Sequence, residues 1–336
     1  MASTRACTGR RLSIVVPVTG DTAALEETLV SVLENRPADT EVIVGLGCDY
    51  ADPWNIGDEV TFVAAPRGAG MVVCVNTALA HATGDVIHVL AAGWRATPGW
   101  TDAPIALIGE GSADAVVPLA VAADDPLHVV EAGLRVSRGG RRRVVVPRRS
   151  AAHADSYSPP RTRESIGPEL VAGFWSAAAL ERVGPGFAAT CGAVADADLA
   201  VALSRTGGRT VVEASSRVIA PALPSAPVPA FTQGLYAERL FWRSMVGAGV
   251  TTSLLAHGLE VLRHAVTTAP LGPVPMLVGR LLATLSFGSY LPRYRQLRAL
   301  IDARTDDAGI DSPATIAIGT RAAAVEPAEP ALRRSA

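Results

Sequence analysis

The chain has 336 residues, of which 49% are hydrophobic and 18% charged, and its formal net charge is −2. These values exclude a chain that is disordered along most of its length, and they exclude an overall attraction to nucleic acid or to anionic lipid. A chain of this length can bury a large core, so we expect one large domain with an appendage.

The first third of the chain alternates predicted strands with predicted helices. Leu12–Val18 is a short β-rich run with Pro17 near its end, and Asp21 or Thr22 can cap the helix that follows. The other elements expected here are strands at 41–45, 60–64 and 85–90, a loop at 66–70 and a helix at 71–82. Strands that alternate with helices at this spacing predict an α/β fold with a doubly wound, mostly parallel sheet.

The pattern changes after the apolar run Ala115–Pro118. Residues 135–149 hold seven arginines among glycine and valine, and a polar loop follows at 150–164. The segment 173–183 suits a helix or a strand edge. Ala195–Thr206 predicts a helix with two aspartates in its first turn, and short strands are expected at 210–213 and 217–219.

The C-terminal part reads as helical. Residues 220–229 contain four prolines, and an amphipathic helical pattern then runs to Ala303 with a break at 270–275. We therefore divide the chain into a flexible N-terminus at 1–11, a main domain at 12–220, a proline-rich linker at 221–235, a helical appendage at 236–303 and a disordered tail at 304–336.

Cysteine usage and hydropathy bear on the compartment. The four cysteines are scattered and show no ligand spacing with histidine, so we predict free thiols and no zinc site. Residues 1–11 lack the apolar core of a secretion signal, and no stretch of about 18 or more apolar residues marks a spanning helix. We expect a cytoplasmic protein, with peripheral contact at the inner face of the membrane left open.

Several short motifs lie in a fixed order between Leu12 and Val218. They are Ser13–Val18, Leu25–Leu33, Glu41–Val44, Arg67–Gly68, Asn76 with Ala82–Asp85, Pro98–Trp100, Arg182–Phe187 and Asp196–Leu199. In this order and spacing they resemble the family 2 glycosyltransferases, which have a GT-A fold, a Rossmann-type sheet. The run Asp124–Gly133 is similar to the rhamnosyltransferase-like branch of that family, in which bacterial enzymes build cell-surface polysaccharides.

The resemblance implies transfer of a sugar from a nucleotide-sugar donor to a hydroxyl of a glycan or lipid-linked acceptor, with inversion. It places the donor at the carboxyl ends of the strands, against Pro17, Thr19, Asp49, Arg67, Asn76, Ala91 and Gly93. It makes Asp196 the base that removes the proton from the acceptor hydroxyl. In the family, a D-x-D pair also holds a divalent metal on the diphosphate.

The sequence departs from the family pattern at the acids. The D-x-D pair falls on Ala91–Ala92–Gly93, and the nucleoside-binding acids fall on Leu46 and Gly47. Ala188 and Ala195 replace two further acids, of the acceptor segment and beside the base. We therefore expect little or no metal binding, and arginine would have to balance the diphosphate charge. The signature of processive synthases is also missing, so we expect a non-processive protein.

Simpler readings stand beside several of these assignments. Asp196 is either the base or an acid favoured by the helix dipole, and Asp198 suits the second role. Asp49 and Asp52 are either substitutes for the lost nucleoside acids or ordinary loop acids. We expect a structural role for Asp85, and for His88 a place in the core rather than in a ligand set.

Two alternatives also concern larger segments. The arginines at 135–149 could meet a diphosphate or an anionic lipid, or they could belong to a solvated hairpin. The helices at 236–300 could lie on a membrane or cover the sheet. For the whole chain, the alternative to a glycosyltransferase is a catalytically inactive relative that binds a partner or a glycan, because fold and function separate easily.

Overall fold

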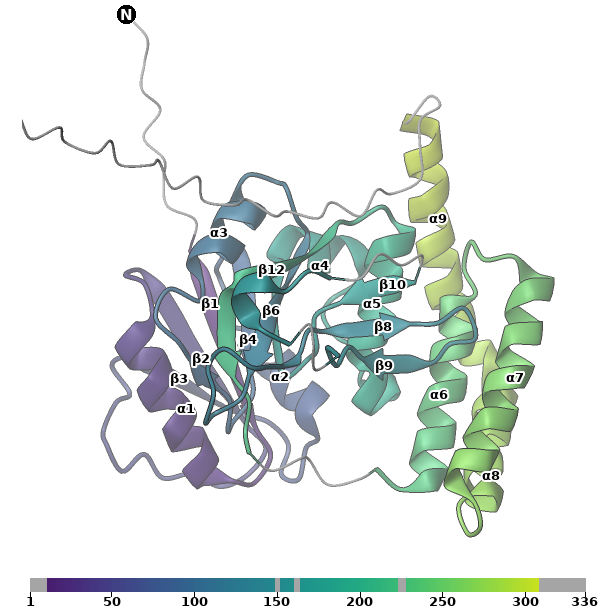
Figure 1. The fold of residues 1–336 in the computed structure, drawn as a ribbon, viewed down its shortest axis with the longest axis horizontal. Helices are drawn as coiled ribbons and strands as arrows, with labels where there is room; N and C mark the ends of the chain where they lie inside the picture. The colour runs from purple at the N-terminus through teal and green to yellow at the C-terminus, as the bar shows by residue number, and fades with distance from the viewer. Residues whose placement is uncertain (1–10, 149–151, 160–163, 223–227, 308–336) are drawn as a thin grey trace, which may run out of the picture.

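The computed structural model of the chain describes residues 11–148, 152–159, 164–222 and 228–307. The predicted flexible N-terminus, except Arg11, and residues 308–336 of the predicted tail lie outside these ranges. The described residues form two sheets with flanking helices and a C-terminal helical layer (Figure 1).

The main sheet has the strand order β3-β2-β1-β4-β11-β6-β12-β5, with β7 paired to β6. Its strands are β1 (Leu12–Val18), β2 (Thr40–Leu46), β3 (Val60–Ala64), β4 (Val86–Leu90), β5 (Arg95–Ala96), β6 (Ala115–Val121), β7 (Val129–Glu131), β11 (Ala172–Ser176) and β12 (Thr210–Ile219). A small antiparallel sheet has the order β10 (Ser165–Gly167), β8 (Leu134–Val136) and β9 (Arg142–Val144).

The helices are α1 (Thr22–Asn35), α2 (Met71–Leu79), α3 (Asp102–Gly109), α4 (Ala177–Val183), α5 (Ala195–Arg205), α6 (Ala230–Ser244), α7 (Val250–Thr268), α8 (Pro273–Leu285) and α9 (Leu291–Asp307). Short 3-10 turns lie at η2 (Ala154–Ser156), η3 (Ala189–Val194) and η4 (Phe287–Tyr290). In Figure 1, α1 and the edge of the main sheet lie on the left, and α6 to α9 lie together on the right.

The predicted α/β fold is confirmed, and the sheet is mixed. Strands β1, β2, β3 and β4 pair in parallel, as expected. Strand β11 then inserts between β4 and β6 antiparallel to both. The carboxyl ends of β1, β2 and β4 therefore meet at one edge of the sheet, which is where ligands bind in open α/β sheets.

Local sequence explains the first elements. Every residue of β1 is buried, which suits a run of β-branched residues in the middle of a parallel sheet. The side chain of Asp21 accepts a hydrogen bond from the backbone N–H of Ala24 and caps α1, as predicted. At the start of β4, a Cβ on Gly84 would lie 2.5 Å from the hydroxyl of Ser13, so only glycine fits this crossing.

Some boundaries differ from the prediction because they depend on distant packing. The segment 173–183 divides into β11 and α4 at Ser176, whose hydroxyl caps the helix. The two strands expected near 210–219 are one strand, β12, with a register shift between Glu213 and Arg217. Helix α6 begins at Ala230, inside the predicted linker, and α9 extends to Asp307.

Apolar clusters fill both faces of the main sheet. One cluster packs α1 and α3 against β1, β2 and β4, and the other packs α2, α4 and α5 on the opposite face. His88 is fully buried in β4, where its ring stacks on Phe174 with centroids 3.9 Å apart. Its Nδ1 lies 2.9 Å from the carbonyl of Gly173, and its Nε2 accepts from the indole of Trp100, so it is a hydrogen-bonded core histidine.

Candidate functional site

The carboxyl edge of β1, β2 and β4 carries the residues that the sequence assigned to a nucleotide sugar. Thr19 is exposed just beyond β1, and the carbonyl of Pro17 accepts a 3.3 Å hydrogen bond from the N–H of Ala92. Asp49 follows β2 and forms a 2.8 Å ion pair with Arg67. Both side chains of this pair are more than four-fifths exposed, at 81% and 83%, so they are free to contact a ligand.

Two neighbours of Asp49 have different roles. The carboxylate of Asp52 accepts from the backbone N–H groups of Trp54 and Ile56 and so holds a turn. The hydroxyl of Tyr50 is buried and has no hydrogen-bond partner among the described residues. Burial raises the pKa of Tyr50, and Glu26 and Asp52 add to the effect. The sequence prediction missed Tyr50, although its position directly after Asp49 was a usable signal.

Asn76 holds two segments together. Its amide donates to the carbonyl of Phe187 at 2.7 Å, and its side-chain oxygen accepts from the N–H of the same residue at 2.9 Å. These reciprocal bonds fasten α2 to the loop before η3. The amide of Asn76 therefore has a structural role in this conformation, because both of its polar atoms are bonded to Phe187.

The segment Ala91–Gly93 does not suit a metal ion. Ala91 is buried, and its N–H donates to the carbonyl of Val171 at 2.8 Å. The N–H of Gly93 donates to the carbonyl of Ala24 and to the hydroxyl of Thr28. Methyl groups and hydrogens supply no oxygen ligand for Mg²⁺ or Mn²⁺. No group of three or more histidine, cysteine or acidic residues in the described ranges could hold a metal either.

Asp196 lies next to this strand edge. It is buried in the first turn of α5, as predicted, and accepts a 3.1 Å hydrogen bond from the N–H of Leu170. The following residue, Val171, accepts the hydrogen bond from Ala91. One short backbone segment thus connects the proposed base to the position of the missing D-x-D pair.

Arg142 of β9 covers the carboxylate of Asp196. Its Nε and Nη2 donate to the two carboxylate oxygens at 2.9 and 2.8 Å, and Nη2 also donates to Glu169 at 2.9 Å. Asp196 and Glu169 outweigh the effect of burial and raise the pKa of Arg142. The arginine-rich segment does form a hairpin, β8–β9, but the side chain of this arginine is only 22% exposed and is held by two carboxylates.

Glu169 and Glu131 complete a cluster of three carboxyls around one guanidinium. Burial raises the pKa of Glu169 to about 8; Arg142 lowers it, and Glu131 and Asp196 add to the increase. Burial also raises the pKa of Glu131, and Arg142 lowers it. Both glutamates therefore favour the protonated form more than an exposed glutamate does. Nothing local in the sequence marks this cluster, because its members come from four distant segments.

Asp198 has a separate partner. Both of its oxygens accept from Arg243 of α6, at 2.6 and 2.7 Å. This pair joins α5 to the C-terminal helices, which fits the structural role expected for Asp198.

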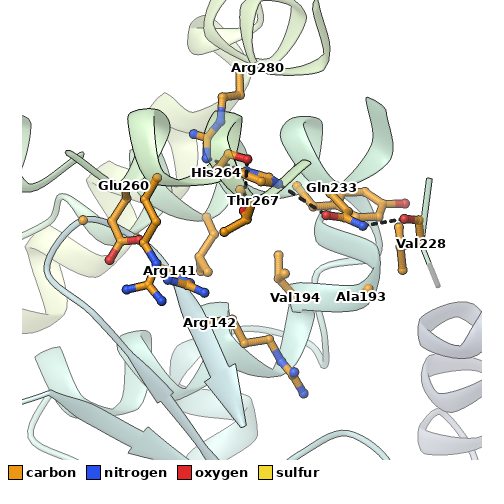
Figure 2. A pocket seen from close by; sticks show the side chains of 16 residues that line it. Arg141, Arg142, Ala193, Val194, Val228, Gln233, Glu260, His264, Thr267 and Arg280 are labelled. Atoms are coloured by element: carbon orange, nitrogen blue, oxygen red, sulfur yellow. Dashed lines mark hydrogen bonds and ion pairs between the residues drawn. The ribbon is translucent and has the colours of Figure 1, made fainter. Parts of the chain in front are cut away.

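A cavity of ≈ 410 Å³ opens on the other side of Arg142 (Figure 2). The hairpin contributes Gly139 to Arg142, the end of η3 contributes Val194, and helices α6, α7 and α8 form the opposite wall. Four arginines line the cavity against a single acid: Arg141, Arg142, Arg263, Arg280 and Glu260. The acid is shared, because Glu260 pairs with Arg141 and also with Arg143.

Polar groups in the cavity wall are held in a fixed chain. Arg280 donates to Nδ1 of His264 at 3.1 Å, and Nε2 of His264 lies 3.3 Å from the side-chain oxygen of Gln233 (Figure 2). Burial lowers the pKa of His264, and Arg280 and Arg141 lower it further. Arg263 makes no ion pair with any described residue. Because Arg141, Arg142 and Arg280 are each paired with an acid, Arg263 supplies the uncompensated positive charge of this lining, which suits an anionic ligand.

Comparison with solved structures places the fold among the glycosyltransferases. S. aureus TarS 1-349 in complex with UDP-GlcNAc has a TM-score of 0.55 at 14% identity, over 88% of this chain and 92% of that chain. GalNAc-T7 with UDP, GalNAc and Mn²⁺ has a TM-score of 0.50 at 13% identity, over 70% of this chain and 48% of that chain. The chain therefore has a GT-A-like fold with a C-terminal helical part. No protein-family model matches the sequence, and no curated protein matches it significantly.

Proposed function

We propose that this protein transfers a sugar from a nucleotide-sugar donor to an acceptor hydroxyl, with inversion and without processivity. The observation that carries the proposal is the position of Asp196, one backbone segment away from the carboxyl edge of β4. In this reaction the acceptor oxygen bonds to the anomeric carbon as the bond to the diphosphate breaks. The acceptor proton passes to the base, and the nucleoside diphosphate leaves.

The donor occupies the carboxyl edge of β1, β2 and β4. Arg67 and Asp49 form the exposed pair at this edge, and the unpartnered hydroxyl of Tyr50 lies in the same loop. Since Ala91 to Gly93 offer no metal ligands, cationic side chains balance the charge of the diphosphate. Arg67 is suited to this because a guanidinium binds phosphate oxygens in a bidentate manner and stays charged.

Asp196 acts as the base, and Arg142 controls its access. In the present conformation both oxygens of Asp196 are bonded to Arg142, so the carboxylate cannot accept an acceptor proton. An acceptor with an anionic group in the adjoining cavity would draw Arg142 toward itself and free one oxygen. The cationic lining of that cavity supports an acceptor that carries phosphate or carboxylate.

The experiment separates donor binding from turnover. Titration calorimetry with UDP, GDP and dTDP, with and without Mn²⁺, tests binding at the strand edge. We expect one nucleotide to bind without Mn²⁺, and Arg67→Gln to weaken it by roughly tenfold, the loss of one charge-assisted contact. Arg36→Gln is the control, because Arg36 also pairs with an acid, Glu59, but at the other end of the strands, and its side chain is less exposed, at 21%.

Turnover is followed by release of nucleoside diphosphate from a panel of nucleotide sugars. Asp196→Asn should lower the rate by roughly 10²–10⁴-fold while leaving nucleotide affinity unchanged. An unchanged rate in Asp196→Asn would refute the assignment of the base.

A catalytically inactive binding protein is the second candidate. Two observations favour it. The strand edge lacks the acids of the family, and Arg142 donates hydrogen bonds to both carboxylate oxygens of Asp196. It predicts nucleotide or glycan binding with no release of diphosphate from any donor. Tight binding of a nucleoside diphosphate, with no release of that diphosphate from any nucleotide sugar tested, would select this candidate over the enzyme.

A further inference from the structure

Helices α7 and α8 each expose a row of large apolar side chains. Leu255, Leu259 and Leu262 of α7 and Leu277, Leu281 and Leu285 of α8 are between 45% and 74% exposed. We call these six residues the apolar face. Their spacing of three and four places them along one side of each helix.

This helical layer buries charged and polar side chains beside small and apolar ones such as Met276 and Ala283, while it exposes large apolar ones. The buried side of α8 includes Arg280, whose side chain is 8% exposed, while leucines and valines face outward. On α7 the side that faces the protein carries Ser253, His257 and His264. A helix in water normally buries its apolar stripe and exposes its charges.

The layer is held firmly in this orientation. The carboxylate of Glu238 in α6 accepts from Arg280 at 2.7 Å, lies 3.0 Å from His257 and accepts from the indole of Trp242. Helices α6 and α8 also cross at two glycines: a Cβ on Gly279 would lie 2.1 Å from the carbonyl of Phe231, and one on Gly234 would lie 2.0 Å from that of Met276. The apolar face therefore cannot turn inward without breaking a buried polar network.

Positive charge borders the apolar face. Arg263 of α7 is exposed and follows Leu259 by four residues, about one turn along the same helix. From Val250 to Tyr290 the one acidic residue is Glu260, and it already forms ion pairs with two arginines of the hairpin. Anionic headgroups complement such a border. A second copy of the chain, packed across a two-fold axis, would present its own arginines to the same border.

We propose that the apolar face lies in the headgroup region of an anionic lipid bilayer. Among the described residues no single helix is long and apolar enough to cross a membrane; α8 and the segment Phe287–Thr305 meet the length and composition criteria only as a pair bent by 62°. The 13 residues of α8 extend over about 20 Å, less than the roughly 30 Å of a hydrocarbon core. The face thus enters one leaflet, with α8 and α7 lying along the surface.

This docking does not depend on the glycosyltransferase proposal, since it concerns lipid binding alone. It has one consequence for that proposal. Helix α7 carries the apolar face on one side and Arg263 and His264 of the cationic cavity on another. A docked α7 would hold that cavity close to the anionic headgroups.

The test is sedimentation of the full chain with sucrose-loaded vesicles. One set contains phosphatidylcholine alone, and the other contains phosphatidylcholine with phosphatidylglycerol. We expect binding to the mixed vesicles that weakens as salt rises. The partition coefficient of the double variant Leu259→Glu/Leu281→Glu onto the mixed vesicles should be lower by about tenfold or more, because two charges would enter the interface. Val30→Glu on α1 is the matched control, since Val30 is 56% exposed but lies away from the face.

Sedimentation velocity without lipid completes the experiment. A wild-type chain that stays in the supernatant with both vesicle sets overturns the proposal. So does equal vesicle binding by the wild type and the double variant. A lipid-free dimer that the double variant converts to monomer, with no vesicle binding by the wild type, assigns the face to a second copy. Nucleotide binding and turnover are read separately, so failure here leaves the proposed activity intact.

Discussion

Arg142 and Asp196 face each other through two parallel hydrogen bonds of 2.9 and 2.8 Å, although they lie 54 residues apart in the chain. The pair fastens the β8–β9 hairpin to the first turn of α5. It also places a charged group between the strand edge and the cationic cavity, which makes it the most testable contact of the site.

Loss of Arg142 should strongly destabilise the fold. Arg142→Gln would leave Asp196 and Glu169 buried beside each other without their shared cation. We expect the free energy of unfolding to fall by about 3–5 kcal/mol, as measured by urea denaturation. Arg143→Gln on the same strand is the control, because its side chain is 42% exposed and its loss should cost less than about 1 kcal/mol. Equal losses in the two variants would show that Arg142 is not a special contact.

Glu169 should make stability decrease as the pH rises. Its pKa of about 8 in the fold lies above the ordinary value of 4.5, so the folded protein keeps a proton that the unfolded chain releases. Its contribution is therefore present below about pH 4.5 and is lost as the pH rises toward about 8. In Glu169→Gln this loss should disappear from a series of urea denaturation curves. A variant with the wild-type pH slope would place the proton elsewhere, for which Glu131→Gln is the next test.

His88 should make the free energy of unfolding fall as the pH becomes more acidic, the opposite direction to the effect of Glu169. Burial lowers the pKa of His88 to about 3 from an ordinary 6.5. The unfolded chain binds a proton that the folded chain excludes, so stability falls as the pH drops from 6.5 toward 3, by at most about 1.4 kcal/mol per pH unit. His88→Gln should flatten this part of the curve, whereas replacement of the exposed His81 should not. A wild-type slope in His88→Gln would assign the acid sensitivity to other groups.

The glycine contact between α6 and α8 should tolerate no side chain. In Gly279→Ala the new Cβ would meet the carbonyl of Phe231 at 2.1 Å, and backbone atoms cannot move aside cheaply. We expect a loss of about 1–3 kcal/mol in thermal or urea denaturation. Gly258→Ala in α7 meets nothing within 4 Å and should instead stabilise the chain by about 0.4–1 kcal/mol. Similar effects at the two positions would mean that α6 and α8 pack less closely than described.

The sequence predicts those parts of the molecule whose causes are local. Strand β1 follows from a run of β-branched residues, the start of α1 from its aspartate cap, and His88 from its place in an apolar strand. The parallel direction of β1 and β2, and of β3 and β4, follows from the helix between each pair. Asp196 in the first turn of a helix is likewise visible in the sequence, and the resemblance to glycosyltransferases identified it as the candidate base.

The remaining features depend on contacts between distant segments. No local signal shows that Arg142, among seven arginines, is the one that meets Asp196, or that Glu169 and Glu131 join them. Strand β11 pairs with β4 and β6, which lie far from it in sequence, and α6, which begins at Ala230, packs against α8. The amphipathic pattern of the C-terminal helices was evident in the sequence, but not that α8 buries Arg280 and exposes its leucines.

Two ion pairs anchor the first turn of α5 to different parts of the fold. Asp196 secures the hairpin through Arg142, and Asp198, about 3 Å further along the helix axis, secures α6 through Arg243. A ligand that broke the Arg142–Asp196 pair would leave only the second of these two ion pairs, Arg243–Asp198, to anchor this turn. Binding of such a ligand at Asp196 and the position of α6 relative to α5 should therefore be thermodynamically linked.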